Sequence, residues 1–540
     1  MNRKITTALL MAAVATGASM AQSAYDAYSL IPTQLRGTAR FVSMGGAFTS
    51  LGGDLSTLGQ NPAGLAMYRY NDIGATLNIS AASFNAATNQ GSLSHNRTKA
   101  YFDNIGYAGV VNLNGAMRSF NWGVSYTRLQ SFDRVTSGRI YPTTTSLSNY
   151  IANYTNGVNS DDILETKDFN PFETGHDWLS ILAYNSFMIN NTAGSNTSYD
   201  GLFKSNTNGD AMFEVHEFGH VDEYNIDFAG NISDVVYWGI GVGIMDMEYS
   251  AESNYSESMS EALVYNSTTD ALSNGDAEYY LYNQKHVNGT GANVKLGLIL
   301  RPVDQLRIGL AVHTPTWMHL SHYGYGSTDY TYTPVDESTG QVNGAVTSSK
   351  DPYYTPDFDY RSRLNTPWRI MAGISYVIGG KAIISADYEH VAYNNMKLKQ
   401  ENYGYYGGFT DNEYANTDIK DYFKGSDILR IGAELRVTNR FSVRAGYNYQ
   451  STAVRDAATV PGANIYTYGT DPSYSFFGDI NNISVGLGYR YGGWYIDFAY
   501  QHSRREGTYH AFTDFAGQHA PTAKLKNTYN NFVLSTGFRF

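Results

Sequence analysis

Apolar and polar positions alternate at the C-terminal end of the chain. Counting back from Phe540 to Phe532, every second residue is Phe, Leu or Thr, while the positions between carry Arg, Gly, Ser and Val. A period of two predicts a β-strand with one apolar face and one small or charged face. The same alternation recurs at 236–244, 429–437 and 441–449. Each run is about 9–11 residues long, the length that a tilted strand needs to cross a bilayer.

The connections between these runs differ in length in a regular way. Short turns and long connections alternate along the chain, and counting the runs predicts fourteen strands with both chain ends on the side of the short turns. Short turns opposite long loops are typical of an outer-membrane β-barrel. A soluble sandwich would also alternate, but it does not explain why the long connections all fall on one side. They lie near 85–97, 136–215, 252–277, 325–358, 393–424, 453–474 and 504–525.

The N-terminus and the composition predict an exported protein. Arg3 and Lys4, the apolar stretch 5–14 and the small residues before Gln22 form a signal-peptide pattern, which predicts cleavage after residue 21. Tyr (46) and Gly (53) are abundant and Cys is absent, which suits strands with aromatic girdles and an oxidising compartment. The formal charge of −12 argues against a nucleic-acid partner.

The segment 22–69 does not alternate. A short helix is predicted at 43–51 and a turn at 55–58, and glycines at 45, 46, 52, 53, 59 and 64 allow tight bends and close backbone approach. A compact segment ahead of the first strand has no obvious place except the barrel lumen. We therefore predict three parts, a signal peptide 1–21, a hatch or plug 22–69 and a transmembrane barrel 70–540 whose longest extracellular loop is 136–215.

Three short motifs in this segment resemble a known family. Ser43-Met44-Gly45-Gly46-Ala47, Gly52-Gly53-Asp54 and Asn61-Pro62-Ala63-Gly64-Leu65 are similar to the N-terminal hatch of the FadL/TodX family of hydrophobic-compound transporters. The stretches 364–369 and 384–388 resemble mid-barrel pairs of its Bacteroidetes members. Only the motif Asn61, Pro62, Ala63 and Gly64 is carried over residue by residue, because the longest loop follows the third strand here and the family's ligand-contact residues cannot be placed.

The resemblance implies an all-β protein, a 14-stranded antiparallel transmembrane β-barrel in the Gram-negative outer membrane, plugged by its hatch and monomeric. It implies passive uptake of hydrophobic, fatty-acid-like molecules, above all long-chain fatty acids, with membrane lipid around it and no cofactor. A second interpretation uses the same fold as a secretion-system component or cargo shuttle, which needs no apolar tunnel. A membrane-embedded hydrolase is a third, but no nucleophile motif supports it, so we expect no enzyme and no catalytic residue.

Charged residues occupy inward positions of several predicted strands. In a narrow lumen they must find partners, because unpaired buried charges are costly. One interpretation is a network of ion pairs within the wall, and the other is that some wall charges bind the hatch. The hatch residues concerned are Arg36, Arg40 and Asp54, and the wall residues are Arg430, Glu434, Arg436 and Arg444. Asn61 is expected to hydrogen-bond the wall as well.

The third predicted strand contains a break in its pattern. Its outward positions are aromatic or Val until Arg128, and an Arg facing lipid costs about 1–3 kcal/mol, depending on depth. Arg128 either reaches up to the headgroups or marks a break in register at Arg128 and Leu129. Members of the family have an inward kink of this strand that opens sideways into the bilayer, and these two residues are the candidate lateral gate.

The loop 136–215 is too long for a simple connection. Thr174 and Asp177 are spaced like a capping box, apolar residues follow at helical spacing, and a second helix is predicted around 147–154. The apolar stripe either packs against its own protein or forms an outer groove that captures substrate. The candidate groove residues are Phe172, Trp178, Leu182 and Phe187.

The stretch His216-Glu217-Phe218-Gly219-His220 matches the zinc-protease signature H-E-x-x-H. The chemistry needs a helix, on which the two imidazoles converge on one metal. The flanking residues favour a strand, on which the two histidines would lie about 13 Å apart. No metal site is expected.

Overall fold

The computed structural model describes residues 23–402, 407–460, 463–467 and 469–540. Fourteen strands form a closed antiparallel barrel in which each strand pairs with its neighbours in chain order. The pairing of β1 with β23, from Asp72 opposite Arg539 to Ala87 opposite Lys524, closes the ring. The strands are β1 (Asp72–Thr88), β2 (Gly91–Asn112), β3 (Met117–Ser131), β7 (Asn208–Ile232), β8 (Val236–Asn266), β9 (Ala271–Val303), β10 (Leu306–His313), β15 (Arg369–Ile378), β16 (Ala382–Val391), β19 (Ser426–Arg436), β20 (Phe441–Gln450), β21 (Tyr474–Tyr491), β22 (Trp494–His510) and β23 (Thr522–Arg539).

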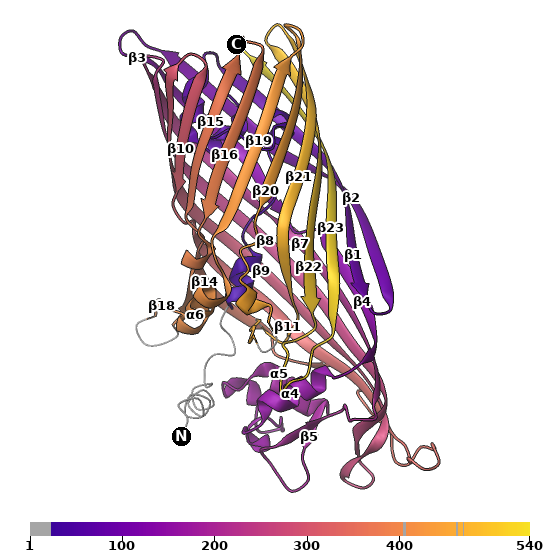
Figure 1. Cartoon of the computed structure of the whole chain (residues 1–540). Helices are drawn as coiled ribbons and strands as arrows, with labels where there is room; N and C mark the ends of the chain where they lie inside the picture. The colour runs from indigo at the N-terminus through magenta and orange to yellow at the C-terminus, as the bar shows by residue number, and fades with distance from the viewer. Residues whose placement is uncertain (1–22, 403–406, 461–462, 468) are drawn as a thin grey trace, which may run out of the picture.

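Further strand segments continue the wall. β4 (Arg134–Thr143) pairs with the outer part of β7, and β11 (Trp317–Pro334) pairs with β9 beyond β10. The remaining segments are β5 (Ile189–Asn191), β6 (Tyr199–Gly201), β12 (Thr347–Ser348), β13 (Tyr353–Tyr354), β14 (Phe358–Asn365), β17 (Lys397–Glu401) and β18 (Phe409–Asp411). The short turns and the C-terminus lie at one end, which we call the turn end, and the long connections lie at the opposite loop end (Figure 1).

The alternation predicted for the last strand is present in β23. Phe532 and Leu534 are 42% and 43% exposed, whereas Val533 between them is 1% exposed. Large apolar side chains stand exposed in this way around the barrel, on β1, β8, β19 and other strands. Water would penalise such a surface, so the outer face suits a lipid environment. Tyr489, Tyr491 and Trp494 are exposed near the turn end, where an aromatic girdle is expected.

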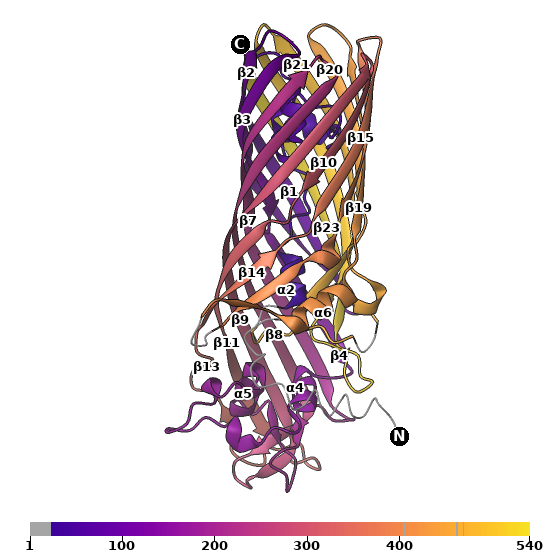
Figure 2. The same cartoon turned by 90° about the vertical axis from the view of Figure 1, so that its left-hand side faces the viewer.

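Several connections predicted as loops are wrong in their bounds, because the strands run on. The region 252–277 is mostly strand, with β8 reaching Asn266 and β9 starting at Ala271, and β7 already begins at Asn208. Beyond the bilayer the outward face need not be apolar, so the alternation that marks a membrane strand disappears while backbone pairing continues. Figure 2 shows these strands extending past the rest of the wall at the loop end.

The helices belong to the segments inside the barrel and at its loop end. The hatch carries α2 (Ala24–Ser29), α3 (Ala39–Ser43), η1 (Leu55–Gly59) and η2 (Pro62–Met67). The segment 147–201 after β4, which we call the insert, carries α4 (Leu147–Thr155), η3 (Ser160–Asp162), η4 (Pro171–Glu173), α5 (Trp178–Asn185) and the hairpin β5–β6. The others are η5 (Tyr393–Asn395), α6 (Glu413–Tyr422) and η6 (Asp456–Ala458). Among the residues described, no helix is both long and apolar enough to cross a membrane.

Two helix predictions need correction. In the hatch the helix precedes residue 43 instead of following it, because Thr38 caps α3 and Gly45 and Gly46 adopt positive φ directly after it. In the insert the cap of α5 is Asp177 itself, whose side chain accepts from the Ser180 amide. The helix predicted around 147–154 is present as α4. The signal peptide and its cleavage site lie outside the described residues.

Candidate functional site

Inward-facing glycines of the wall lie directly against the hatch backbone. A Cβ atom at Gly446 of β20 would overlap the backbone of Met44, and one at Gly309 of β10 would overlap that of Thr49. The same holds for Gly239, Gly297, Gly432 and Gly486, which meet other hatch atoms. The small inward face of the strands therefore makes room for the hatch backbone itself.

The motif starting at Asn61 holds the hatch turn and touches the wall. The Asn61 side chain caps η2 by accepting from the Ala63 amide at 3.0 Å. Its Nδ2 donates to the Thr49 carbonyl at 2.6 Å and to the Leu310 carbonyl of β10 at 3.4 Å. The expected hydrogen bond to the wall is therefore present. Pro62 starts η2, and Gly64 packs on Gly52 where a side chain would not fit.

A chain of buried ion pairs links the hatch to the wall. Arg40 Nε donates to Glu434 on β19 at 2.8 Å, and the same carboxylate oxygen accepts from Arg444 Nε on β20 at 2.7 Å. Arg444 Nη1 donates to Asp497 on β22 at 2.6 Å. The two predicted alternatives, a wall network and an anchor for the hatch, occur together in this chain. Each charge depends on its partners, because all four side chains are buried.

The other charged residues proposed to link the hatch and the wall, Arg36, Asp54 and Arg436, each have different surroundings. Arg36 pairs with Asp103 of β2 at 2.7 Å, and Asp103 gave no signal in the sequence because it sits at an irregularity of register. Asp54, expected to face wall charges, instead binds within the hatch, accepting from Thr38 Oγ1 at 2.6 Å and from the Ser56 amide at 3.0 Å. Asp is well suited to such a cap. Arg436 is exposed at the end of β19.

A cavity of about 160 Å³ lies between the leading segment of the hatch and the wall. Its apolar lining residues include Ile31, Leu129, Met245, Val391 and Ile428. Its polar lining residues include Gln60, Asn293, His313, Arg430 and Asn448. A cavity of about 150 Å³ holds one benzene molecule in other proteins, so there is room for one ring or a short stretch of acyl chain.

Arg430 is part of the cavity lining and carries hydrogen-bond donors without a partner among the described residues. Its Nη2 donates to Glu389, which also accepts from Arg369 Nε at 2.5 Å. The Nε and Nη1 of Arg430 have no hydrogen-bond partner among the described residues, although the residue is only 6% exposed. Two acceptor atoms, Gln60 Oε1 and Asn293 Oδ1, likewise have no hydrogen-bond partner among the described residues. The lining therefore combines apolar side chains with polar residues that carry unpaired hydrogen-bonding atoms.

The backbone pairing of β3 changes at the predicted break. β3 pairs with β2 from Ser119 opposite Asn112 to Thr127 opposite Asn104, and among the described residues the β2–β3 ladder ends there. On its other side β3 pairs with β7 as far as Ser131, with a shift of register between Arg128 and Gln130. Continuous pairing of this strand with both neighbours would argue against a gate, and the pairing is not continuous. Leu129 lies at the break and lines the cavity.

Arg128 is neutralised on the outer face. Its guanidinium makes two hydrogen bonds to Asp222 of β7, at 2.9 and 3.0 Å, and Tyr126 donates to the same carboxylate at 3.0 Å. The pair offsets the cost that a lone Arg would have beside lipid. Asp222 occupies an outward position of β7, directly opposite Arg128 of β3. An acidic residue at an outward position of the next long strand is the sequence feature that could have predicted this ion pair.

On the loop-end side of the break, side chains instead of a backbone ladder close the gap between β2 and β4. Arg97 donates to Asp133 at 2.8 Å, and Lys99 pairs with the same carboxylate. Further out, the ring of His95 and the hydroxyl of Ser137 are 2.7 Å apart. Along 91–103 the backbone of β2 pairs with β1 alone, and β4 pairs with β7 alone, among the described residues. We call this side-chain contact the seam.

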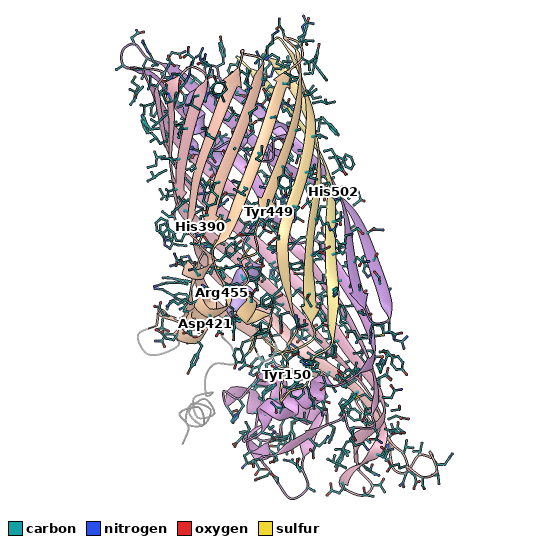
Figure 3. All side chains as sticks on the ribbon, in the orientation of Figure 1. Tyr150, His390, Asp421, Tyr449, Arg455 and His502 are labelled. Carbon is teal, nitrogen blue, oxygen red and sulfur yellow. The ribbon has the colours of Figure 1, made fainter. Side chains whose placement is uncertain are left out.

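The candidate groove residues lie inside a packed cluster. Leu182 is not exposed at all, Trp178 and Phe172 are 7% and 8% exposed, and the partly buried Phe187 packs against the same cluster. Tyr150, labelled in Figure 3, stacks on Phe512 with 5.4 Å between the ring centroids, and it packs against the same cluster. The insert thus packs against its own protein at the loop end, and a groove there would require the insert to move.

A buried acid ties the insert to the wall. Glu257 of β8 accepts from Tyr255 at 2.6 Å, from Tyr279 at 2.7 Å and from the Leu147 amide at 3.1 Å, and Ser146 also donates to it. This carboxylate lies at the first turn of α4, where helix amides favour a negative charge. Burial nevertheless raises the pKa of Glu257 above its usual value of 4.5.

The H-E-x-x-H stretch lies wholly within β7. His216 contacts Glu214 at 2.6 Å, and His220 lies 3.5 Å from Asp222. Among the residues described, no group of three or more potential ligands could hold a metal ion. The prediction of a strand in place of a zinc-binding helix is confirmed.

Comparisons with known proteins bear on the fold. No model of a known family matches the chain, and no curated protein matches it at a significant level. The crystal structure of a Pseudomonas aeruginosa FadL homologue matches with a TM-score of 0.52 and 13% identity, covering 94% of this chain and 99% of that one. A TodX monoaromatic hydrocarbon channel deltaS2 mutant matches with a TM-score of 0.50 and 14% identity, covering 93% and 99%. The resemblance of the hatch motifs to the FadL/TodX family thus extends to the fold of the chain, a fourteen-stranded antiparallel barrel.

Proposed function

We propose that the protein is an outer-membrane channel for passive uptake of hydrophobic compounds, with long-chain fatty acids as its main substrates, acting as a monomer. The observation that carries the proposal is the cavity between hatch and wall, because Thr127 and Leu129, at the point where β3 leaves β2, are part of its lining. The lipid-facing belt and the similarity in fold to hydrophobic-compound channels support it.

Different residues around the cavity would bind the apolar and the charged part of an amphiphile. Ile31, Val391 and Ile428 offer an apolar surface for a hydrocarbon chain. The guanidinium group of Arg430, a residue of the cavity lining, would attract a carboxylate, because hydrogen bonds to an ionised acceptor are stronger than neutral ones. Release through the seam beside Leu129 would place the substrate in the bilayer, so that the hydrocarbon need not enter water. The candidate lateral gate therefore remains Arg128 and Leu129.

The experiment is uptake of radiolabelled oleate by cells or proteoliposomes that contain the protein. We expect saturable uptake that follows the gradient without added energy. Arg430→Met should weaken oleate uptake more than uptake of toluene, which has no carboxylate. Arg455→Met is a matched control at the loop end, outside the cavity lining. Uptake no faster than in empty vesicles for both compounds would overturn the proposal.

The alternative is a secretion-system component or cargo shuttle, and one observation favours it. The insert packs as a closed apolar core at the loop end, and a barrel covered in this way needs no apolar tunnel to serve as a docking partner. In that role the barrel would act as a binding partner instead of a conduit. Purification in mild detergent separates the two, since a channel should retain a lipid-like molecule and a secretion component a protein.

A further inference from the structure

Arginines gather at inward positions of the turn end, although the whole chain is acidic, with a formal charge of −12. Five wall strands place one there, and we call these five residues the arginine rim. Each lies one inward position beyond a buried residue of its strand, such as Ile299, Gly309 or Glu434. The rim consists of Arg301 of β9, Arg307 of β10, Arg436 of β19, Arg490 of β21 and Arg539 of β23.

Only two arginines of the rim form an ion pair among the described residues. Arg539 Nε lies 2.9 Å from an oxygen of Asp72, and Arg301 lies 2.5 Å from Asp304, whose side chain is 85% exposed. The other acidic residues at this end are bonded elsewhere, Glu434 and Asp497 to Arg40 and Arg444, Asp54 within the hatch and Asp234 to Asn231. Three arginines of the rim are therefore left without a counter-ion.

Arg307 is one of these three. Its Nη1 donates to the Leu51 carbonyl of the hatch at 2.8 Å. Its Nε is buried and has no hydrogen-bond partner among the described residues. Three further arginines, Arg40, Arg69 and Arg301, repel its charge. Such repulsion in a partly buried place costs free energy unless an anion lies among the charges.

Arg490 is in a similar situation on the other side of the hatch. Its side chain makes no ion pair and no hydrogen bond with any of the described residues, and it is partly open to solvent. Arg40 and Arg539 repel its charge more strongly than the paired acids Asp497 and Glu434 attract it. Arg40 is thus close to both Arg307 and Arg490, and it joins the two sides of the rim.

The hatch surface between these arginines has room for a ligand. We call residues 38–67 the hatch body, which lies against the wall glycines and is bound to the wall through Arg40 and Asn61. Gly53 lies on its surface, and a Cβ atom built there would have no other atom within 4 Å. The Gly53 carbonyl accepts from Arg40 Nη1 at 3.2 Å, so this open place lies beside the arginine that both sides of the rim share.

We infer that the arginine rim binds an oxyanion, a phosphate or carboxylate group, with Arg307 and Arg490 as its binding residues. The planar guanidinium group matches two oxygens of such an anion at once. Tyr489 and Tyr491, which flank Arg490, and Trp494 are exposed as in an aromatic girdle, so the rim lies at the level of lipid head groups.

The inferred ligand is therefore the head group of an anionic amphiphile or a free phosphate that arrives at the turn end. Short turns face the periplasm in outer-membrane barrels, so the ligand would come from that side. No residue of the rim belongs to the lining of the central cavity. The inference does not rest on the proposed uptake function, and loss of uptake would leave it unaffected.

The first test is protection of individual arginines from phenylglyoxal, which modifies free guanidinium groups, in the full-length protein in non-ionic detergent. Oleoyl lysophosphatidic acid at ten times its dissociation constant should slow modification of Arg307 and Arg490 about tenfold, because only the unliganded fraction reacts. Mass spectrometry of the peptides measures each site separately. Arg504, with a half-exposed side chain on the outer face of β22, is the internal control and should change less than about twofold.

The matched control ligand is monoolein, which has the same acyl chain without the phosphate and should give no protection. Inorganic phosphate separates the two sources of the anion. Protection by phosphate alone assigns the site to the oxyanion whichever molecule carries it, and protection only by the lipid assigns it to lipid head groups. Equal modification rates with lysophosphatidic acid and monoolein would overturn the inference.

The second test asks whether Arg490 is instead a structural residue. Because neighbouring charges repel it, Arg490→Gln should unfold at the same or a higher temperature than the unsubstituted protein when no phosphate is present. The rise in unfolding temperature caused by phosphate, compared with chloride at equal ionic strength, should fall by at least about half, since bound ligand stabilises only the folded form. A lower unfolding temperature with an undiminished phosphate effect would contradict the inference. Arg444→Gln, at a paired arginine, should lower the unfolding temperature in either salt.

Discussion

The hatch body and the insert fill the two ends of one barrel, but different forces hold them. The hatch body touches the wall through backbone against glycine and through buried ion pairs such as Arg40 with Glu434. The insert packs through an apolar core around Leu182, with one buried acid, Glu257. Polar and steric contacts specify one position closely, whereas an apolar core tolerates repacking. The difference suggests a plug of defined position at the turn end and a more adaptable cover at the loop end.

The largest expected effect comes from removing the shared cation of the wall. Arg444→Met removes the guanidinium that donates to the buried carboxylates of Glu434 and Asp497. The substitution should lower the free energy of unfolding by about 3–5 kcal/mol. Denaturant unfolding of the refolded barrel measures the loss. Arg504→Met is the control, since Arg504 and its partner Glu506 are 51% and 62% exposed in their side chains, and little change is expected there. Similar stability of both variants would contradict a polar anchor at the turn end.

Leu182→Ala should affect the insert and leave the hatch unchanged. Removing a fully buried leucine costs about 2–5 kcal/mol locally. Hydrogen exchange should accelerate in α4 and α5 but not in α3. Leu164→Ala, at a leucine of the same segment that is 40% exposed, is the control. If α3 also exchanged faster, the two ends would be coupled and the comparison would fail.

Gly446→Ala tests the contact between hatch backbone and wall. The new methyl group would overlap the Met44 backbone, so displacement of the hatch should cost about 1–3 kcal/mol. Limited proteolysis and exchange in α3 report the displacement. Gly478→Ala makes the same change where the nearest atom is 3.5 Å away. A hatch equally protected in both variants would argue against direct contact.

The smallest effect concerns pH at the insert. Burial raises the folded-state pKa of Glu257 above its unfolded value, so the folded form holds a proton more tightly. Its contribution to stability is full below pH 4.5 and falls as pH rises through the folded-state pKa. Exchange of α4, corrected for the intrinsic rate, should be slower at about pH 5 than at pH 8. Glu257→Gln should remove most of this difference, and an unchanged pH dependence would show that another group causes it.

Sequence reasoning succeeded wherever the signal was local. The lipid-facing register of β23 and the break at Arg128 follow from which side chains face outward, and both could be seen in single strands. The extensions of β8 and β9 were missed because polar strands outside the bilayer have no apolar face to mark them. The start of α3 was misplaced because the cap at Thr38 lies before the glycine-rich stretch that suggested the helix.

The sequence by itself determined the number of strands, the face that each turns to lipid and the presence of a hatch, because a bilayer imposes a period of two on every strand that crosses it. Only the tertiary structure decided what the inward positions meet. Gln34 and Ser131 are 97 residues apart and Arg40 and Glu434 are 394 apart, and no periodicity connects such pairs. Their contacts depend on how the barrel closes around the hatch, and for that reason the end of the β2–β3 ladder was visible only in the folded chain.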